Sequence, residues 1–328
     1  MIYVIGYYGH QNVGDEQFRD SIAYILDRQS PGEPVSFVDC DHIDGMAFPA
    51  DAKIVLGGGD VMNTYFLDQI YEVFAGTTHE ITALSVGVPF VSIYKAPSFR
   101  RINRIFVRTF QDTARPSFLR ASQTWRVVVD ASIFLLDIPK PERVSRYVTH
   151  LKGRLEHAGR PVLMVSLNAT AIYRAPMLFG ELMLLLLRVS ETYHFCFVPY
   201  STEPDYDDRV AAREAASLLP DAHVTVVEEA LDAWDIMSLM QLSRQHLSMK
   251  FHSGLFSLYT GLPFVAVSSE RKVANLCKDI GYVGQYYTEA TIGTAPLDLL
   301  KNVVPIAGDV LPKMRAHAHE MYGIARNK

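Results

Sequence analysis

The chain has 328 residues, a formal net charge of −5 and 49% hydrophobic residues. This composition excludes a disordered chain, and the acidic balance excludes a general attraction to nucleic acid or to anionic membranes. The length exceeds the usual size of one hydrophobic core, so we expect two domains. The three cysteines, Cys40, Cys196 and Cys277, are widely spaced and indicate reduced thiols rather than a disulfide framework or a metal site.

The N-terminal residues MIYVIGYYG are typical of a first strand and carry no basic secretory signal. The most apolar helical segment, MLFGELMLLLLRV, contains Glu181 and Arg188 and is too short to span a bilayer. We therefore expect a soluble, cytoplasmic protein with at most peripheral membrane association.

The first half of the chain alternates between apolar, strand-like runs and short helical patterns. We expect strands at residues 3–5, 35–39, 53–56, 89–94, 104–107 and 126–129, and helices reaching residue 28 and covering 66–74 and 116–121. Strands separated by short helices predict a parallel sheet with helices on both faces.

The same alternation restarts after residues 139–160, a stretch that mixes proline, glycine and charge. The predicted strands are 162–166, 195–198, 224–227, 246–249 and 264–267, and the predicted helices are 177–191, 206–218, 231–242, 254–260, 273–280, 296–304 and 311–325. We therefore predict an α/β fold of two Rossmann-like domains, residues 1–145 and 146–328, that face each other across a cleft, with the last helix packing back on the first domain.

The first strand opens into the glycine-containing loop GYYGHQNVGDE, residues 6–16. Its glycine spacing does not fit GxGxxG, and acids in the first helical turn repel a phosphate at that helix N-terminus, which argues against dinucleotide binding. We expect the loop to line an acceptor site, where Tyr8 and Asn12 contact the acceptor and Asp15 bonds or deprotonates a hydroxyl. The alternative is a capped helix start after a tight turn.

Two further strand ends of the first half carry residues of the kind that bind ligands. The GGGD sequence at residues 57–60 lets backbone approach a ligand closely, and Asp60 either caps the next helix or contacts substrate. Arg108 ends another strand, and a guanidinium forks well onto a carboxylate or phosphate. The simpler interpretations are a plain turn for residues 57–60 and an ordinary surface arginine for Arg108.

The stretch HLSMKFHSGLFSLYTGLPFVAVSSERK, residues 246–272, predicts a strand, a short helix and a second strand. Parallel strands joined by one crossover end at the same edge of a sheet, so Lys250, His252 and Lys272 are expected at one crevice, where open α/β sheets bind ligands. Cations there favour an anionic ligand. A lone histidine is more often structural, and Glu203, after another strand end, is a weaker candidate.

These sequence motifs, taken in chain order, resemble those of the polysaccharide pyruvyl transferase family. The resemblance rests on GYYGHQNVGDE at 6–16, LGGGD at 56–60, Arg108 before Asp112, VVVD at 127–130, VPY at 198–200 and SMKFHSGLFSLYTGLPFVAVSSERK at 248–272. Each motif alone is loose, but the ordered set spans most of the chain.

The resemblance implies a fold similar to GT-B glycosyltransferases and transfer of the pyruvyl group of phosphoenolpyruvate to a saccharide, which forms a pyruvate ketal. The saccharide would be polymeric or linked to a lipid or nucleotide, and no metal or organic cofactor is required. Carried over by position, Arg108 and Lys272 are similar to the family's anchors for phosphoenolpyruvate, and His252 is similar to its catalytic acid. We also expect Lys250, Gly58 and Gly59 to contact phosphoenolpyruvate, and Asp15 and Asp60 are candidate bases. The acceptor contacts cannot be carried over from the family, and for them we expect Glu203 together with Tyr8 and Asn12.

One position departs from the family pattern, and two other functions fit the same residues. The family motif often reads Arg-apolar-His, whereas this chain has Lys250, a point charge without the planar fork of arginine. The first alternative function is a GT-B glycosyltransferase that uses a nucleotide sugar. The second is a non-catalytic carbohydrate-binding protein that keeps the fold.

Overall fold

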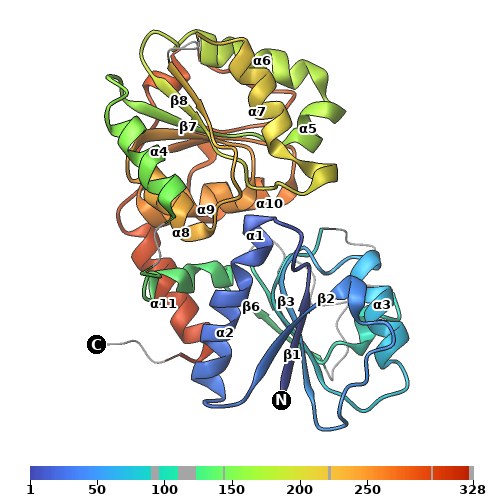
Figure 1. The fold of residues 1–328 in the computed structure, drawn as a ribbon. Helices are drawn as coiled ribbons and strands as arrows, with labels where there is room; N and C mark the ends of the chain where they lie inside the picture. The colour runs from blue at the N-terminus through green and yellow to red at the C-terminus, as the bar shows by residue number, and fades with distance from the viewer. Residues whose placement is uncertain (90–95, 110–122, 143–144, 221–222, 297, 325–328) are drawn as a thin grey trace. The chain divides into compact units, whose positions relative to one another are not determined.

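The chain divides into two compact units. A computed structural model describes residues 1–89, 96–109, 123–142, 145–220, 223–296 and 298–324 (Figure 1). Unit 1 comprises Met1–His10, Asp15–Pro139 and Pro312–Lys328, and unit 2 comprises Gln11–Gly14 and Lys140–Leu311. The last helix, α11 (Val310–Tyr322), therefore belongs mostly to unit 1, while a short piece of the N-terminal glycine loop belongs to unit 2.

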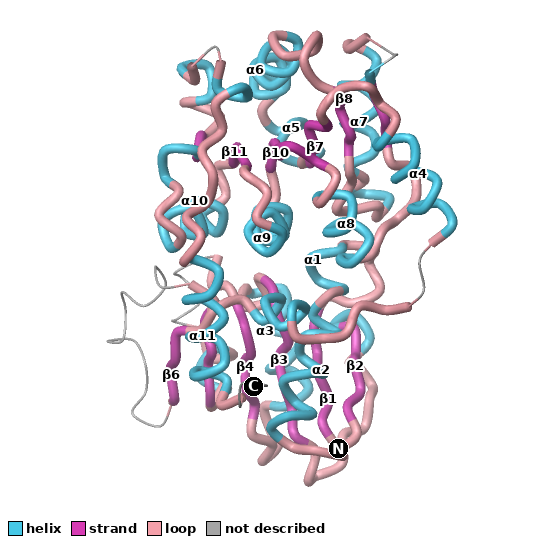
Figure 2. The backbone as a smooth tube through the Cα atoms, turned by 90° about the vertical axis from the view of Figure 1, so that its left-hand side faces the viewer, coloured by secondary structure: helices cyan, strands magenta, loops and turns pink. Residues whose placement is uncertain are grey.

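Unit 1 is built on a parallel sheet, which in the described part of the chain has six strands in the order β2-β1-β3-β4-β5-β6. The strands are β1 (Ile2–Gly6), β2 (Val35–Asp39), β3 (Lys53–Gly59), β4 (Ile81–Val86), β5 (Arg104–Val107) and β6 (Thr124–Val127), and its helices include α2 (Phe18–Gln29) and α3 (Thr64–Phe74). The short helix α1 (Val13–Glu16) is divided, because Val13 and Gly14 belong to unit 2 and Asp15 and Glu16 to unit 1. Apolar side chains of α3 share a core with Ile54 and Leu56, whereas Ile22 of α2 lies against Gly57. Because β3 side chains alternate between faces, the two helices cover opposite faces of the sheet (Figure 1 and Figure 2).

Unit 2 contains a second parallel sheet, with the described strands in the order β12-β11-β10-β7-β8-β9. Its strands are β7 (Val162–Ser166), β8 (His194–Phe197), β9 (Val224–Val226), β10 (Ser243–Ser248), β11 (Phe264–Val267) and β12 (Tyr286–Tyr287). Its helices are α4 (Arg146–Glu156), α5 (Ala169–Arg174), α6 (Pro176–Leu187), α7 (Asp208–Ser217), α8 (Ala233–Met240), α9 (Phe251–Thr260) and α10 (Arg271–Asp279). Read from its first strand, this is the 3-2-1-4-5-6 order of dinucleotide-binding Rossmann folds.

Local sequence signals fix several helix ends. The side chains of Asn63, Asn168 and Asp232 accept hydrogen bonds from backbone N–H groups at the starts of α3, α5 and α8. Each thereby satisfies one backbone donor that has no partner within its helix. Helix α9 ends at Gly261, whose φ of 71° lies in the left-handed region, and Pro263 prevents its continuation. Among the described residues no helix is both long enough and apolar enough to cross a membrane.

The structure corrects several predicted element bounds. Strand β4 was not expected, and β3 continues through the three glycines. Where a helix was predicted at 296–304, the described residues contain a short 3-10 turn, Leu299–Lys301. Helix α9 begins at Phe251 rather than at 254, which places His252 inside its first turn. The predicted strand at 89–94 falls almost entirely outside the described residues, and so does the predicted helix at 116–121.

Candidate functional site

The topology of unit 2 marks one edge of its sheet as the place for a ligand. Strands β7 and β10 are neighbours, and from β7 the chain first runs outward to β8 and β9 before it returns to β10. Ligands of open α/β sheets bind beside the carboxyl ends of strands at such a reversal. The segment between β10 and α9, which carries Lys250, lies at this point, and His252 follows it in the first turn of α9.

Lys250 precedes α9 and is held by a buried carboxylate. Its Nζ lies 2.6 Å from Oδ2 of Asp208, which is 1% exposed. The same carboxylate accepts backbone N–H groups from Tyr200 and Ser201 at 3.1 and 2.9 Å, and from Ala169 at 3.3 Å. Asp208 therefore ties the loops after β7, β8 and β10 together, and Lys250 supplies the positive charge that balances it.

His252 lies against the glycine loop from the other end of the chain. The Gln11–Gly14 segment pairs with the chain after β8, because Val13 N donates to Tyr200 O at 2.9 Å and Thr202 N donates to Gln11 O at 3.2 Å. A Cβ at Gly14 would lie 2.1 Å from Nδ1 of His252, far inside contact distance. Two motifs that are distant in the sequence thus meet within unit 2.

The other predicted residues of unit 2 lie on neighbouring loops. Asn12 accepts the N–H of Gly14 at 3.1 Å and forms an antiparallel bridge with Ser201. Glu203 is half-buried and precedes a 3-10 turn. Lys272 lies in the first turn of α10 with Nζ 3.2 Å from Glu270, so it sits beyond the neighbouring strand β11, as the βαβ pattern predicts.

The remaining predicted residues belong to unit 1, where Asp15 lies beside the glycine strand. A Cβ at Gly59 would lie 2.8 Å from Oδ1 of Asp15, and the φ of 78° at Gly59 is one that side-chain-bearing residues rarely adopt. At the neighbouring Gly58, a Cβ would strike the ring of Phe18. Tyr8, predicted as an acceptor contact, is instead buried, and its hydroxyl donates to Gly57 O at 3.0 Å.

Arg108, predicted as an anion anchor, is the centre of a buried ion-pair cluster in unit 1. Its guanidinium donates to Asp60 at 2.7 Å and to Asp130 at 3.1 Å, and its side chain is 3% exposed. Burial opposes its charge, but the two carboxylates outweigh burial and raise the pKa of Arg108. The cluster holds the ends of β3, β5 and β6 together, and Asp60, predicted as a base, is one of its members.

Several functional candidates were not found by sequence reasoning. Asp208 and Asp130 gain their importance from partners elsewhere in the fold. Asp130 lies just after β6, whereas Asp208 is the first residue of α7. His246, inside the stretch singled out at first, is buried between Ser257 and Ser166, at 2.7 and 2.9 Å. Burial lowers its pKa to about 3, so this imidazole is neutral and structural.

One more group lies at the carboxyl ends of β1 and β2 in unit 1. It consists of His10, Asp39 and Asp41, whose ligand-type atoms lie within 4.8 Å of one another. His10 follows the first strand inside the predicted glycine loop, while the two acids follow β2. The DCDH sequence at 39–42 was the available signal.

The chain matches no known family model, and no curated protein matches its sequence. Solved structures of similar fold include an alpha,alpha-trehalose-phosphate synthase (UDP-forming) from Burkholderia vietnamiensis, with a TM-score of 0.61 and 12% identity over 98% of this chain and 94% of that one. S. aureus MnaA bound to UDP has a TM-score of 0.59 and 11% identity over 100% and 98%. The UDP-GlcNAc 2-epimerase of Methanocaldococcus jannaschii, with UDP-GlcNAc and UDP, has a TM-score of 0.59 and 10% identity over 98% and 99%. The chain therefore has the predicted fold class, two Rossmann-like α/β units similar to those of GT-B glycosyltransferases.

Proposed function

We propose that this protein is a transferase that modifies a saccharide with a group taken from a phosphate-bearing donor. The observation that carries the proposal is the arrangement at the β7/β10 reversal in unit 2, where Lys250 and His252 lie at the N-terminus of α9. A ten-residue helix directs unsatisfied backbone N–H groups and a partial positive charge toward a phosphate at this end. His252 adds an acid–base group beside that position.

A nucleoside diphosphate sugar is the first candidate donor. The solved structures of similar fold include one protein bound to UDP, one bound to UDP-GlcNAc and UDP, and a UDP-forming synthase, and each matches nearly the whole chain. In this reaction an acceptor hydroxyl attacks the anomeric carbon, and the nucleoside diphosphate leaves with the bonding electron pair. Lys250 and the N-terminus of α9 would stabilise the negative charge that develops on the departing phosphate.

Phosphoenolpyruvate is the second candidate donor, and the contact of Gly14 with His252 favours it. The resemblance to polysaccharide pyruvyl transferases rests most heavily on residues 6–16 and 248–272, and both stretches contribute to unit 2. Here an acid protonates the methylene carbon, one saccharide hydroxyl attacks C2, and a second hydroxyl replaces phosphate. The products are a pyruvate ketal and inorganic phosphate, and His252 is the proposed acid.

A donor panel separates these candidates. The chain is incubated with UDP-glucose, UDP-GlcNAc or phosphoenolpyruvate and a set of saccharides, and the products are analysed by mass spectrometry. A glycosyl adduct supports the first donor, and a pyruvyl adduct with released phosphate supports the second. His252→Ala should lower turnover about 100- to 10,000-fold, while His150→Ala, an exposed histidine of α4, should leave it unchanged. Saccharide binding without consumption of any donor would contradict the proposal and favour a non-catalytic binding protein.

A further inference from the structure

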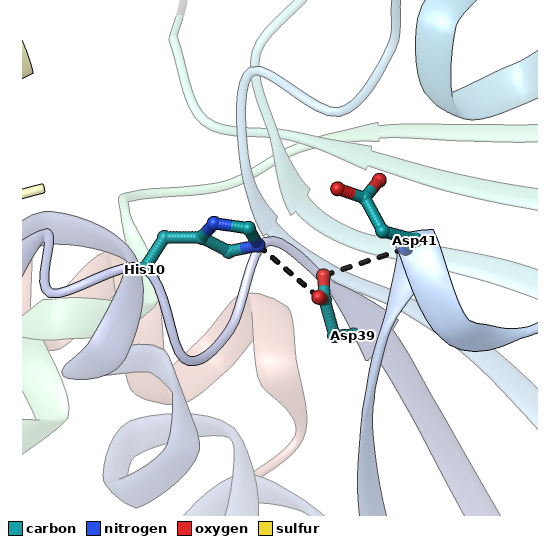
Figure 3. A group of neighbouring side chains, drawn as sticks. All are labelled: His10, Asp39 and Asp41. Carbon is teal, nitrogen blue, oxygen red and sulfur yellow. Dashed lines mark hydrogen bonds and ion pairs between the residues drawn. The ribbon is translucent and has the colours of Figure 1, made fainter. Parts of the chain in front are cut away.

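A histidine and two carboxylates converge at the sheet edge of unit 1 (Figure 3). His10 comes from the loop after β1, whereas Asp39 ends β2 and Asp41 lies in the 3-10 turn that follows it. Nε2 of His10 is 3.1 Å from Oδ2 of Asp39, and the ligand-type atoms of all three residues lie within 4.8 Å of one another. The side chains therefore surround one small space between two adjacent strand ends.

A second imidazole reaches the same carboxylate oxygen. Nδ1 of His42 is also 3.1 Å from Oδ2 of Asp39, although the side chain of His42 is 80% exposed. Two imidazole nitrogens and two carboxylates are thus available at the ends of β1 and β2. This combination is richer than an acidic surface cluster, because imidazole nitrogen distinguishes transition-metal sites from sites that attract any cation.

Neighbouring side chains orient these groups. The ring of Tyr7 stacks on the ring of His10 with centroids 3.6 Å apart and planes inclined by 5°. The hydroxyl of Tyr65 donates to Oδ1 of Asp41 at 2.5 Å. Such outer contacts fix the direction in which ligating side chains present their atoms.

We propose that His10, Asp39 and Asp41 bind one divalent transition-metal ion of the Zn²⁺ class, with His42 close enough to complete the ligand set. Ligands bound to Zn²⁺ at about 2.0–2.2 Å lie about 3.4 Å apart in tetrahedral geometry. The 3.1 Å separation of His10 and Asp39 already matches this spacing, and Asp41 needs only a side-chain adjustment to join them. The inference does not depend on the proposed function.

Titration calorimetry of the full chain, stripped with EDTA and titrated with ZnCl₂, tests this site. We expect one ion per chain with micromolar affinity. Asp39→Asn keeps the size and the turn-capping oxygen of the side chain, and it should weaken binding at least tenfold. His10→Phe keeps a ring that can stack on Tyr7 and should weaken binding equally, while His150→Ala should match the wild type.

Two milder variants keep the test decisive if the first pair folds poorly. His42→Ala removes an exposed side chain, so the fold should persist, and the affinity for Zn²⁺ should fall several-fold. Tyr65→Phe removes only the hydroxyl that orients Asp41 and should cost about tenfold in affinity. If the wild type binds no stoichiometric Zn²⁺, or if Asp39→Asn or His42→Ala binds it as tightly as the wild type, the proposed site is wrong.

Discussion

Replacing Gly14 by alanine should disturb His252 directly. Gly14 lies in α1 and has no positive φ, so alanine suits its backbone and only the added methyl group matters. That methyl would lie 2.1 Å from Nδ1 of His252 and 3.0 Å from its Cγ and Cε1, whereas ordinary contacts begin near 3.4 Å. The imidazole must therefore move by more than an ångström or α1 must shift.

The expected cost is that of overpacking a well-filled site, about 1–3 kcal/mol of unfolding free energy. Because the strain arises between two side chains, it should vanish when His252 is truncated. In a double-mutant cycle, Gly14→Ala should cost about 1–3 kcal/mol in the wild type and close to zero in the His252→Ala background. Turnover should also fall, since a shift of about 1 Å in a catalytic group costs on the order of 100-fold.

Urea unfolding followed by circular dichroism measures the four free energies of this cycle. The matched control is Gly153→Ala in α4, a helical glycine whose added methyl meets no atom within 4 Å. That variant should be neutral or about 0.5–1 kcal/mol more stable, because alanine favours the helix. The contact between Gly14 and His252 would be refuted if Gly14→Ala cost the same unfolding free energy in the wild type and in the His252→Ala background. It would also be refuted if Gly14→Ala alone changed neither stability nor turnover.

Three further predictions concern groups whose partners the structure defines. His246 has a pKa of about 3 in the folded protein, below its value in the unfolded chain. Its contribution to stability is therefore complete above about pH 6.5 and falls by about 1.4 kcal/mol per pH unit below that. In His246→Gln, the free energy of unfolding in urea should depend less steeply on pH between pH 7 and 5, and a slope equal to that of the wild type would contradict this. Lys250→Met should cost about 1.5–3 kcal/mol of unfolding free energy in urea by leaving Asp208 without its cation. Lys250→Arg should recover only part of this cost, because the guanidinium brings N–H groups that find no acceptor, and a Lys250→Met variant as stable as the wild type would contradict the pairing. Arg108→Lys should cost a similar amount, because an ammonium cannot fork onto both buried carboxylates; a thermal midpoint equal to that of the wild type would argue against this role.

The fold class was predictable because its signals are local. Alternating apolar runs and helical patterns identified most strands, and β2, β5, β7 and β11 have the predicted bounds. The exceptions have physical causes. Strand β4 contains Thr82 and Ser85, which break its apolar run, and β3 continues through glycines that a sequence pattern assigns to a turn. In β3, Gly57 and Gly59 pair with β4, and this pairing outweighs the low strand propensity of glycine.

The candidate site was predictable only in part, since its residues acquire their roles from distant partners. Strand-end positions correctly placed Lys250, His252 and Lys272 at one edge of a parallel sheet. No local sequence pattern could predict that Lys250 pairs with Asp208 or that Gly14 lies against His252, because both contacts depend on the tertiary packing of unit 2. The same holds for Arg108, whose sequence context resembles a basic surface segment but whose side chain is buried.

The lysine at position 250 has a structural explanation. Asp208 receives three backbone N–H groups, two of them on the oxygen that Lys250 contacts, so little acceptor capacity remains for a further donor. A compact ammonium fits that remaining place, whereas a guanidinium would bring additional N–H groups that need other acceptors. Lysine therefore balances the charge of Asp208 and needs no second carboxylate as a hydrogen-bond acceptor. The Lys250–Asp208 pair holds the segment before α9 against the loops after β7 and β8, so a lysine at this position is compatible with the local structure.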